Sequence, residues 1–217
     1  MAELDVITEQ HKKFKSAKDT DANEPKVTDN RETTSDMETL VVGRTMEKEE
    51  ILASLSQSMQ NDITILPICG LGGLGKTTLA KMVYDSSQFK EYSKVWVYVS
   101  RTLDLMTIGN SIISQLSMEK NESGYTIMQM IHNSLRELLA DKKILIVLDD
   151  LWESDVDKLK SLTDMLKIGK GGNVVVMVTT RDEDIANKIS TIQPYKLTPL
   201  TDEIGRASCR ERVYVLV

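Results

Sequence analysis

The sequence contains few of the residues on which extracellular, metal-binding or membrane proteins depend. Its 217 residues include two cysteines, four prolines and two phenylalanines. Cys69 and Cys209 are too few for a disulfide framework, and their spacing fits no metal site. No run of about 18 apolar residues is present, so no transmembrane helix is predicted. The N-terminus also lacks the basic and apolar stretches of a secretory signal, and we therefore expect an intracellular, cytoplasmic protein.

An excess of positive charge is missing as well. Lys and Arg total 27 against 33 Asp and Glu, which gives a formal net charge of −6, and the basic residues are not concentrated in one segment. This distribution does not favour nucleic acid as a main partner. A hydrophobic content of 41% and a charged content of 28% are instead typical of a globular domain.

The distribution of apolar side chains divides the chain. Between Phe14 and Met37, the one sizeable apolar residue is Val27. This is too little apolar area to balance the entropic cost of ordering the backbone. We therefore expect residues 1–38 to be a disordered linker or the remnant of an N-terminal region, and residues 39–202 to form one domain.

A glycine-rich loop at residues 70–78 is the most informative motif. Its sequence, GLGGLGKTT, fits the phosphate-loop pattern G-x-x-x-x-G-K-[ST] between an apolar run and an amphipathic helix. In this pattern, glycines let backbone N–H groups surround an anion, the lysine reaches the β- and γ-phosphates, and the hydroxyl ligates Mg²⁺. The alternative is a glycine turn that only joins a strand to a helix. We predict a nucleoside phosphate site built from Gly70, Gly72, Gly73, Gly75, Lys76 and Thr77.

A second motif is an aliphatic run, residues 144–148, that ends in Asp149 and Asp150. Parallel sheets bind ligands at the carboxyl ends of their strands, beside the phosphate loop. We predict that Asp149 holds Mg²⁺, directly or through water, and that Asp150 orients and deprotonates an attacking water. Such a string is common at strand ends, and it gains weight because it lies about 70 residues after a phosphate loop.

A third run, residues 174–180, reads as a strand that ends at Arg181. At the same sheet edge, a guanidinium can contact a γ-phosphate. The alternative is a surface ion pair between Arg181 and Asp182 or Glu183 at the start of the next helix.

The order of the apolar segments predicts the fold. Strands expected at residues 63–69, 95–100, 143–148, 174–180 and 195–197 alternate with helical segments. This predicts an α/β fold of the P-loop NTPase type, with a doubly wound, mainly parallel five-stranded sheet and helices on both faces. The second strand is apolar throughout, which predicts burial on both faces. Core packing is therefore favoured over base stacking for Trp96 and Tyr98.

Taken together, these segments resemble the NB-ARC domain, the nucleotide-binding switch of plant intracellular immune receptors with leucine-rich repeats, and specifically receptors of the coiled-coil type. The resemblance covers about residues 38–202, and its motifs follow in the family's order. The segments that carry it are Val42-Gly43-Arg44, residues 70–78, residues 95–100, Leu148-Asp149-Asp150-Leu151-Trp152 and Val178-Thr179-Thr180-Arg181.

The resemblance implies a module of the plant defense response that binds ADP at rest and ATP when active, with at most slow ATP hydrolysis and with oligomers formed only by the intact receptor. It assigns Val42, with Arg44 as a further candidate, to the adenine side and Thr78 to the α-phosphate. It places Lys76, Thr77, Asp149, Asp150 and Arg181 in the phosphate, Mg²⁺, water-activating and γ-phosphate roles described above. An ATPase of another P-loop family and a truncated, non-signalling remnant stay open as alternatives.

The chain departs from the family pattern towards both ends. It has no Gly-Leu-Pro-Leu motif, no Met-His-Asp motif and no leucine-rich repeats, and no full coiled-coil domain precedes Met37. Residues 203–217 lack the acidic and aromatic helix expected there and read as a translated sequencing adapter. We therefore expect a truncated fragment with a non-native tail after Asp202, separated from its coiled-coil and leucine-rich-repeat domains.

Overall fold

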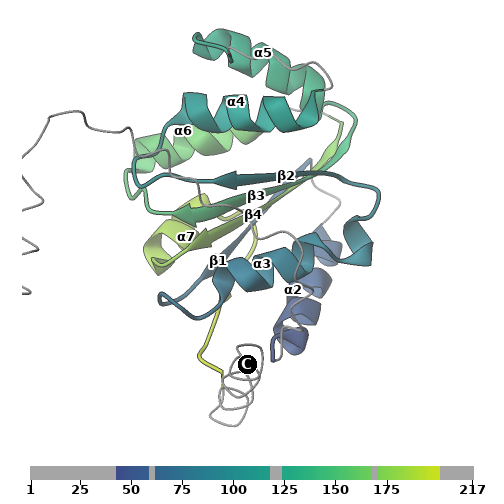
Figure 1. Ribbon diagram of the computed structural model, residues 1–217, viewed down its shortest axis with the longest axis vertical. Helices are drawn as coiled ribbons and strands as arrows, with labels where there is room; N and C mark the ends of the chain where they lie inside the picture. Colours follow the sequence, from purple (N-terminus) through teal and green to yellow (C-terminus); the bar gives the residue numbers. More distant parts are fainter. Residues whose placement is uncertain (1–42, 59–61, 118–123, 168–170, 201–217) are drawn as a thin grey trace, which may run out of the picture. The chain divides into compact units, whose positions relative to one another are not determined.

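A computed structural model describes residues 43–58, 62–117, 124–167 and 171–200, which form a five-stranded sheet with helices on both faces (Figure 1). The predictions for residues 1–38, Val42 and residues 203–217 lie outside the described residues. The strands are β1 (Ile63–Cys69), β2 (Ser93–Tyr98), β3 (Lys143–Leu151), β4 (Asn173–Thr180) and β5 (Tyr195–Lys196). The helices are α2 (Thr45–Ser58), α3 (Lys76–Tyr84), the 3₁₀ helix η1 (Ser87–Phe89), α4 (Leu105–Leu116), α5 (Met128–Leu139), α6 (Val156–Leu166) and α7 (Glu183–Ile189). Within these ranges no helix is long and apolar enough to cross a membrane.

The sheet is parallel throughout, in the order β2-β3-β4-β1-β5. Because the strands are parallel, their carboxyl ends share one edge, towards which the arrowheads in Figure 1 point. β4 lies between β1 and β3, so the three segments that follow these strands meet at that edge. They are the phosphate loop, the Asp149-Asp150 pair and Arg181. The predicted α/β, doubly wound parallel sheet is confirmed.

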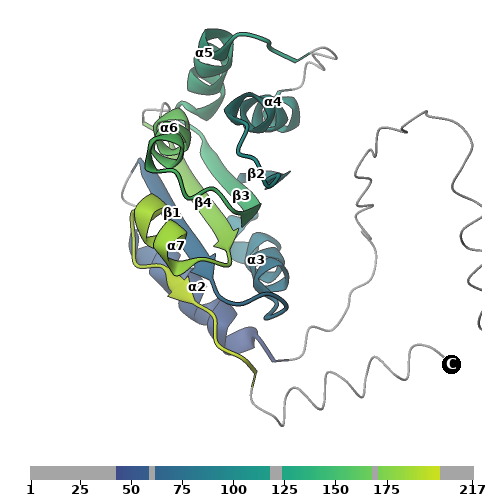
Figure 2. The ribbon, with the colours of Figure 1, turned by 90° about the vertical axis from the view of Figure 1, so that its left-hand side faces the viewer.

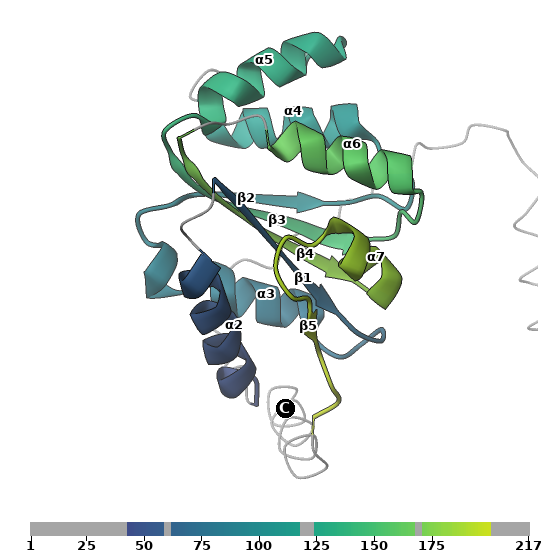
Figure 3. The same cartoon turned by 180° about the vertical axis from the view of Figure 1, so that it is seen from behind.

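The core consists of two apolar clusters, one on each face of the sheet. Successive residues of β3 alternate between them: Ile144 and Ile146 pack with α4, α5, α6 and α7, whereas Leu145 and Val147 pack with α2 and α3. Figure 2 shows the helices on the two sides of the sheet, and Figure 3 shows β5 beside β1 from behind. This alternation explains why the central strands are aliphatic at nearly every position.

β2 corrects one expectation from the sequence. It spans residues 93–98 rather than 95–100 and lies at the end of the strand order, with β3 as its partner. Val95 and Val97 are buried, but Trp96 is partly exposed and Tyr98 is 51% exposed. The prediction of a strand buried on both faces is therefore wrong. Trp96 nevertheless packs against the apolar cluster on the α2 and α3 face, where its ring meets Tyr84 at the end of α3, with 5.3 Å between ring centroids.

The outer edge of β2 is closed by a side chain of α4. Gln115 accepts a hydrogen bond from the Trp96 backbone N–H with Oε1 and donates one to the Trp96 carbonyl with Nε2, both at 3.0 Å. Exposed strand edges offer such unpaired groups to other chains. The Gln115 amide occupies one pair of them, as the backbone of a further strand would.

Replacing Gln115 with alanine should expose this edge. We expect Gln115→Ala to lower the free energy of unfolding by about 1 kcal/mol and to increase self-association, because two backbone groups lose their partner. Urea unfolding and light scattering measure the two effects. Gln129→Ala is the matched control, since the Gln129 amide donates to Asn133 on its own helix and not to a strand edge. Equal behaviour of the two variants would contradict the role assigned to Gln115.

Candidate functional site

The phosphate loop joins β1 to α3 and leaves the start of that helix open. Gly75 is the N-cap residue of α3 with φ of 90°, a conformation that glycine adopts without strain, and it makes no side-chain capping bond. The first N–H groups of a helix have no partner within the helix, and they carry the positive end of its dipole. Gly72, Gly73, Thr77 and Thr78 are exposed around this helix start. The loop therefore presents backbone donors suited to an anion.

Arg44 connects the phosphate loop to two other segments of the chain. Its guanidinium is 3% exposed and donates to the carbonyls of Leu74, at 2.9 Å, and Thr198, at 3.0 Å, while it pairs with Glu47 at 2.5 Å. It thus links the start of α2, the phosphate loop and the segment after β5. These contacts are all to protein groups, and the contact with adenine implied by the family resemblance stays a prediction.

Lys76 reaches back across the phosphate loop. Its Nζ donates to the Leu71 carbonyl at 2.9 Å, and the residue is 8% exposed. Burial, followed by the nearby positive charge of Arg181, lowers the pKa of the Lys76 ammonium, whereas Asp150 and Asp149 act in the opposite direction. Lys76 and Arg181 are therefore close enough to repel each other, and a bound anion would reduce this repulsion.

Asp149 is the buried centre of the site. It is 3% exposed, and its Oδ1 accepts hydrogen bonds from Thr77 Oγ1 at 2.9 Å and from Thr179 Oγ1 at 2.5 Å. The sequence predicted the Thr77–Asp149 pair as a Mg²⁺ site, and the structure brings the two side chains together. Thr179 was not predicted. The signal that could have revealed it is a hydroxyl at the end of an otherwise aliphatic strand, although threonine is common in strands for other reasons.

Asp150 has a different environment from its neighbour. It adopts φ of 63°, which is uncommon for a residue other than glycine, and the pairing of β3 with β4 is irregular between Leu148 and Leu151. Its backbone N–H donates to Thr179 Oγ1 at 2.8 Å. The side chain is 33% exposed, and its Oδ1 lies 3.6 Å from Arg181 Nε. The structure therefore separates the two carboxylates, one buried and one accessible to a reactant.

Arg181 extends from the end of β4 towards the phosphate loop. A Cβ atom placed on Gly72 would lie 3.3 Å from Arg181 Nη1, so the guanidinium adjoins the loop backbone. The alternative pairing with Asp182 or Glu183 is wrong: Asp182 caps α7 by accepting from the Asp184 N–H, and Glu183 pairs with Lys196. The ion-pair partner of Arg181 is instead Asp150, from the neighbouring strand.

The donor set suits Mg²⁺ that is shared with phosphate. Among the residues described, no group of three or more His, Cys, Asp or Glu side chains is placed to hold a metal ion. The Thr77–Asp149 pair offers one hydroxyl and one carboxylate. Mg²⁺ at nucleotide sites is typically bound through one or two such protein ligands, with water and phosphate oxygens completing the octahedron. The residues present therefore fit this ion.

A family comparison matches most of the chain. The model of the NB-ARC domain matches residues 44–213, a range that contains the phosphate loop, both carboxylates and Arg181. Its end lies within residues 203–217, which we expect to be non-native, and the domain limits 39–202 stay a prediction.

Curated relatives are plant disease resistance proteins. The chain is 37% identical over 167 residues to disease resistance protein RGA2 of Solanum bulbocastanum, covering 75% of this chain and 17% of that protein. It is 35% identical over 208 residues to putative disease resistance protein RGA1 of the same species, and this match covers 94% of this chain and 21% of that protein. The match to putative disease resistance RPP13-like protein 1 of Arabidopsis thaliana is 31% over 174 residues, covering 76% and 16%. The chain thus spans about a fifth of these relatives or less.

Two solved structures share the fold of this chain. Cdc6p of Pyrobaculum aerophilum superposes with a TM-score of 0.57 at 14% identity, covering 79% of this chain and 49% of that one. A signal transduction ATPase with numerous domains (STAND) from Pyrococcus horikoshii superposes with a TM-score of 0.52 at 19% identity, covering 84% of this chain and 27% of that one. At these identities the likeness shows the fold alone, and it confirms the predicted P-loop architecture.

Removing the Thr179 hydroxyl should weaken the site's framework. Thr179→Val keeps the side-chain shape but takes one hydrogen bond from the buried Asp149 and leaves the Asp150 N–H without its acceptor. We expect a loss of about 1–3 kcal/mol in the free energy of unfolding, measured by urea denaturation. Thr179→Ser should retain most of the stability.

Thr163→Val is a matched control, because the Thr163 hydroxyl donates to the Leu159 carbonyl within its own helix, α6. If Thr179→Val costs no more than Thr163→Val, the hydroxyl does not hold the two carboxylates.

Proposed function

The chain belongs to the NB-ARC domain family and is related to plant disease resistance proteins, and from this premise we propose that it binds ADP and ATP as the nucleotide switch module of an intracellular immune receptor. One observation supports this most strongly. Lys76 and Arg181, two neighbouring cations, adjoin a glycine loop beside the hydrogen-bonded pair of Thr77 and the buried Asp149. Such an arrangement is suited to a phosphate chain with its divalent cation.

The residues divide the binding task between them. The N–H groups at the start of α3 and Lys76 bind the β-phosphate, which ADP and ATP share. Thr77 and Asp149 would hold Mg²⁺, which supplies charge neutralisation and orientation for the phosphate oxygens. By the family resemblance, we assign Thr78 to the α-phosphate and Val42, with Arg44 as a further candidate, to the adenine side. Arg181 contacts the γ-phosphate, the group that distinguishes the two ligands.

Asp150 and Arg181 form the part of the site that can respond to the third phosphate. Their ion pair is long, at 3.6 Å, and both side chains are partly exposed, so it contributes little stability. A γ-phosphate competes with Asp150 for the guanidinium. Once released, Asp150 can orient an attacking water and accept its proton. We expect slow hydrolysis at most, as a switch requires.

We assign the signalling functions to the intact receptor rather than to this domain. Because the chain covers about a fifth or less of its curated relatives, signalling, oligomer formation and contacts with coiled-coil and leucine-rich-repeat domains belong to the whole protein. Slow or absent multiple-turnover ATP hydrolysis, together with tight ADP binding, would separate this switch from an ATPase of another P-loop family. A remnant without function would bind neither nucleotide.

Removal of the Lys76 ammonium tests nucleotide binding itself. We expect Lys76→Ala to weaken ADP binding about ten- to a hundredfold, because one charge-assisted contact to phosphate is lost. Isothermal titration calorimetry provides the affinity. Lys81→Ala removes the same charge from the exposed face of the same helix and should leave ADP affinity unchanged. Equal ADP affinities of Lys76→Ala and the unaltered protein would refute the proposed site.

The two carboxylates should differ in what they control. Asp149→Asn should reduce the dependence of ATP affinity on Mg²⁺, since the buried ligand becomes a weaker neutral one. Asp150→Asn should leave ATP affinity largely intact and slow single-turnover hydrolysis. Titrations with and without Mg²⁺ and a quenched hydrolysis assay measure these effects. If both variants change the same parameter to the same extent, the assignment of separate roles is wrong.

A further inference from the structure

Two arginines lie against one tryptophan at the carboxyl edge of the sheet. The guanidinium carbon of Arg181 is 4.4 Å from the centroid of the Trp152 ring, and that of Arg101 is 5.9 Å from it. The three residues follow β4, β3 and β2, which are neighbours in the sheet. Trp152 is 39% exposed, so core packing does not account for its position. Its ring instead has contacts with cations, which aromatic faces attract.

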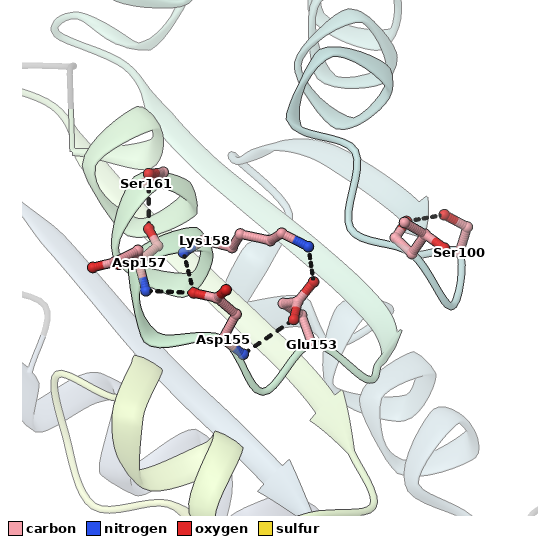
Figure 4. Close-up of polar contacts among 7 residues, drawn as sticks. Ser100, Glu153, Asp155, Asp157, Lys158 and Ser161 are labelled. Carbon is pink, nitrogen blue, oxygen red and sulfur yellow. Dashed lines mark hydrogen bonds and ion pairs between the residues drawn. The ribbon is translucent and has the colours of Figure 1, made fainter.

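Residues that adjoin this cluster in the sequence make short-range hydrogen bonds, and Figure 4 shows those of Ser100, Glu153 and Asp155. After Trp152, Glu153 accepts from the Asp155 N–H and from Lys158 Nζ, both at 3.0 Å, and Asp155 caps α6. Beside Arg101, the Ser100 hydroxyl donates to the Thr102 carbonyl. Trp152 therefore lies in a short segment between β3 and the capped helix α6, and hydrogen bonds within that segment hold its backbone.

Arg181 needs such support. Its side chain is 50% exposed, and its ion pair with Asp150 at 3.6 Å is too long and too exposed to fix it. Ordering an arginine side chain carries an entropic cost, and a planar partner that holds the guanidinium beforehand removes that cost from ligand binding. Trp152 is such a partner, with its ring centroid 4.4 Å from the guanidinium carbon, and the same guanidinium also adjoins the Gly72 backbone.

We propose that Trp152 is a positioning residue that holds Arg181 against the phosphate loop and thereby sets the preference for a nucleoside triphosphate over a diphosphate. The proposal rests on the proposed function, in which Arg181 contacts the γ-phosphate. Lys76 and the α3 N–H groups bind the phosphates common to both ligands, whereas the cation contacts of the Trp152 ring are with Arg181 and Arg101. The ring therefore influences the affinity for the triphosphate and leaves that for ADP unchanged.

The test compares the affinities for ADP and for a non-hydrolysable ATP analogue, both with Mg²⁺, by calorimetry on the full chain. Trp152→Ala should weaken binding of the analogue about three- to tenfold and leave ADP affinity unchanged. Trp152→Phe should restore most of the loss, because it keeps an aromatic face. Arg101→Ala is a matched control: it removes a cation from the same ring at the longer distance and should change the analogue affinity less than Arg181→Ala does.

A double variant separates positioning from a general structural effect. If Trp152 acts through Arg181, adding Trp152→Ala to Arg181→Ala should produce no further loss of analogue affinity. An additional loss in the double variant, or an equal loss for ADP and the analogue in Trp152→Ala, would overturn the proposal.

The outcome also distinguishes this proposal from the proposed function. If Arg181→Ala weakens the analogue and Trp152→Ala does not, only the role of Trp152 is wrong. If Arg181→Ala has no effect, the γ-phosphate role of Arg181 is wrong and the positioning proposal falls with it, whereas ADP binding through Lys76 stands on its own test.

Discussion

The hydrogen bonds to the Asp149 carboxylate are the interaction on which the site depends. A buried charge without partners would destabilise the fold by several kcal/mol. Asp149 finds its donors on two other elements, Thr77 on α3 and Thr179 on β4. The same Thr179 hydroxyl accepts the backbone N–H of Asp150 and so helps to hold that residue at its positive φ. One buried group thus sets the spacing of the phosphate loop, both carboxylates and the strand that leads to Arg181.

Around this fixed centre the site has a rigid part and an adjustable part. Lys76 and Asp149 are buried and bonded to protein groups. In the proposed binding mode they face the portion of the ligand that ADP and ATP have in common. Asp150 and Arg181 are partly exposed and joined by a long ion pair. A switch requires this division, because ligand affinity comes from the part that does not change, and discrimination comes from side chains whose alternative contacts are close in energy.

The sequence predicted the features that depend on local pattern and left open those that depend on neighbours in space. Glycine spacing identified the phosphate loop, and aliphatic runs identified the central strands. The edge position of β2 could not be read from its apolar residues, because the same composition suits a central strand, and so the exposure of Tyr98 was not anticipated. Arg181 was compared with carboxylates near it in the chain, whereas its partner Asp150 is brought to it by the pairing of β3 with β4. Val42 and the domain limits stay predictions.

The contacts of Arg44 have a mechanical consequence. One buried guanidinium joins the carbonyl of Leu74, inside the phosphate loop, to that of Thr198, beyond the last strand. Hydrogen bonds to charged groups contribute about 1.5–3 kcal/mol each, so the two backbones cannot shift independently without a measurable cost. A displacement of the chain at Thr198 is therefore coupled to the phosphate loop through this one side chain. Arg44 therefore restrains the distance between the phosphate loop and the segment that follows β5.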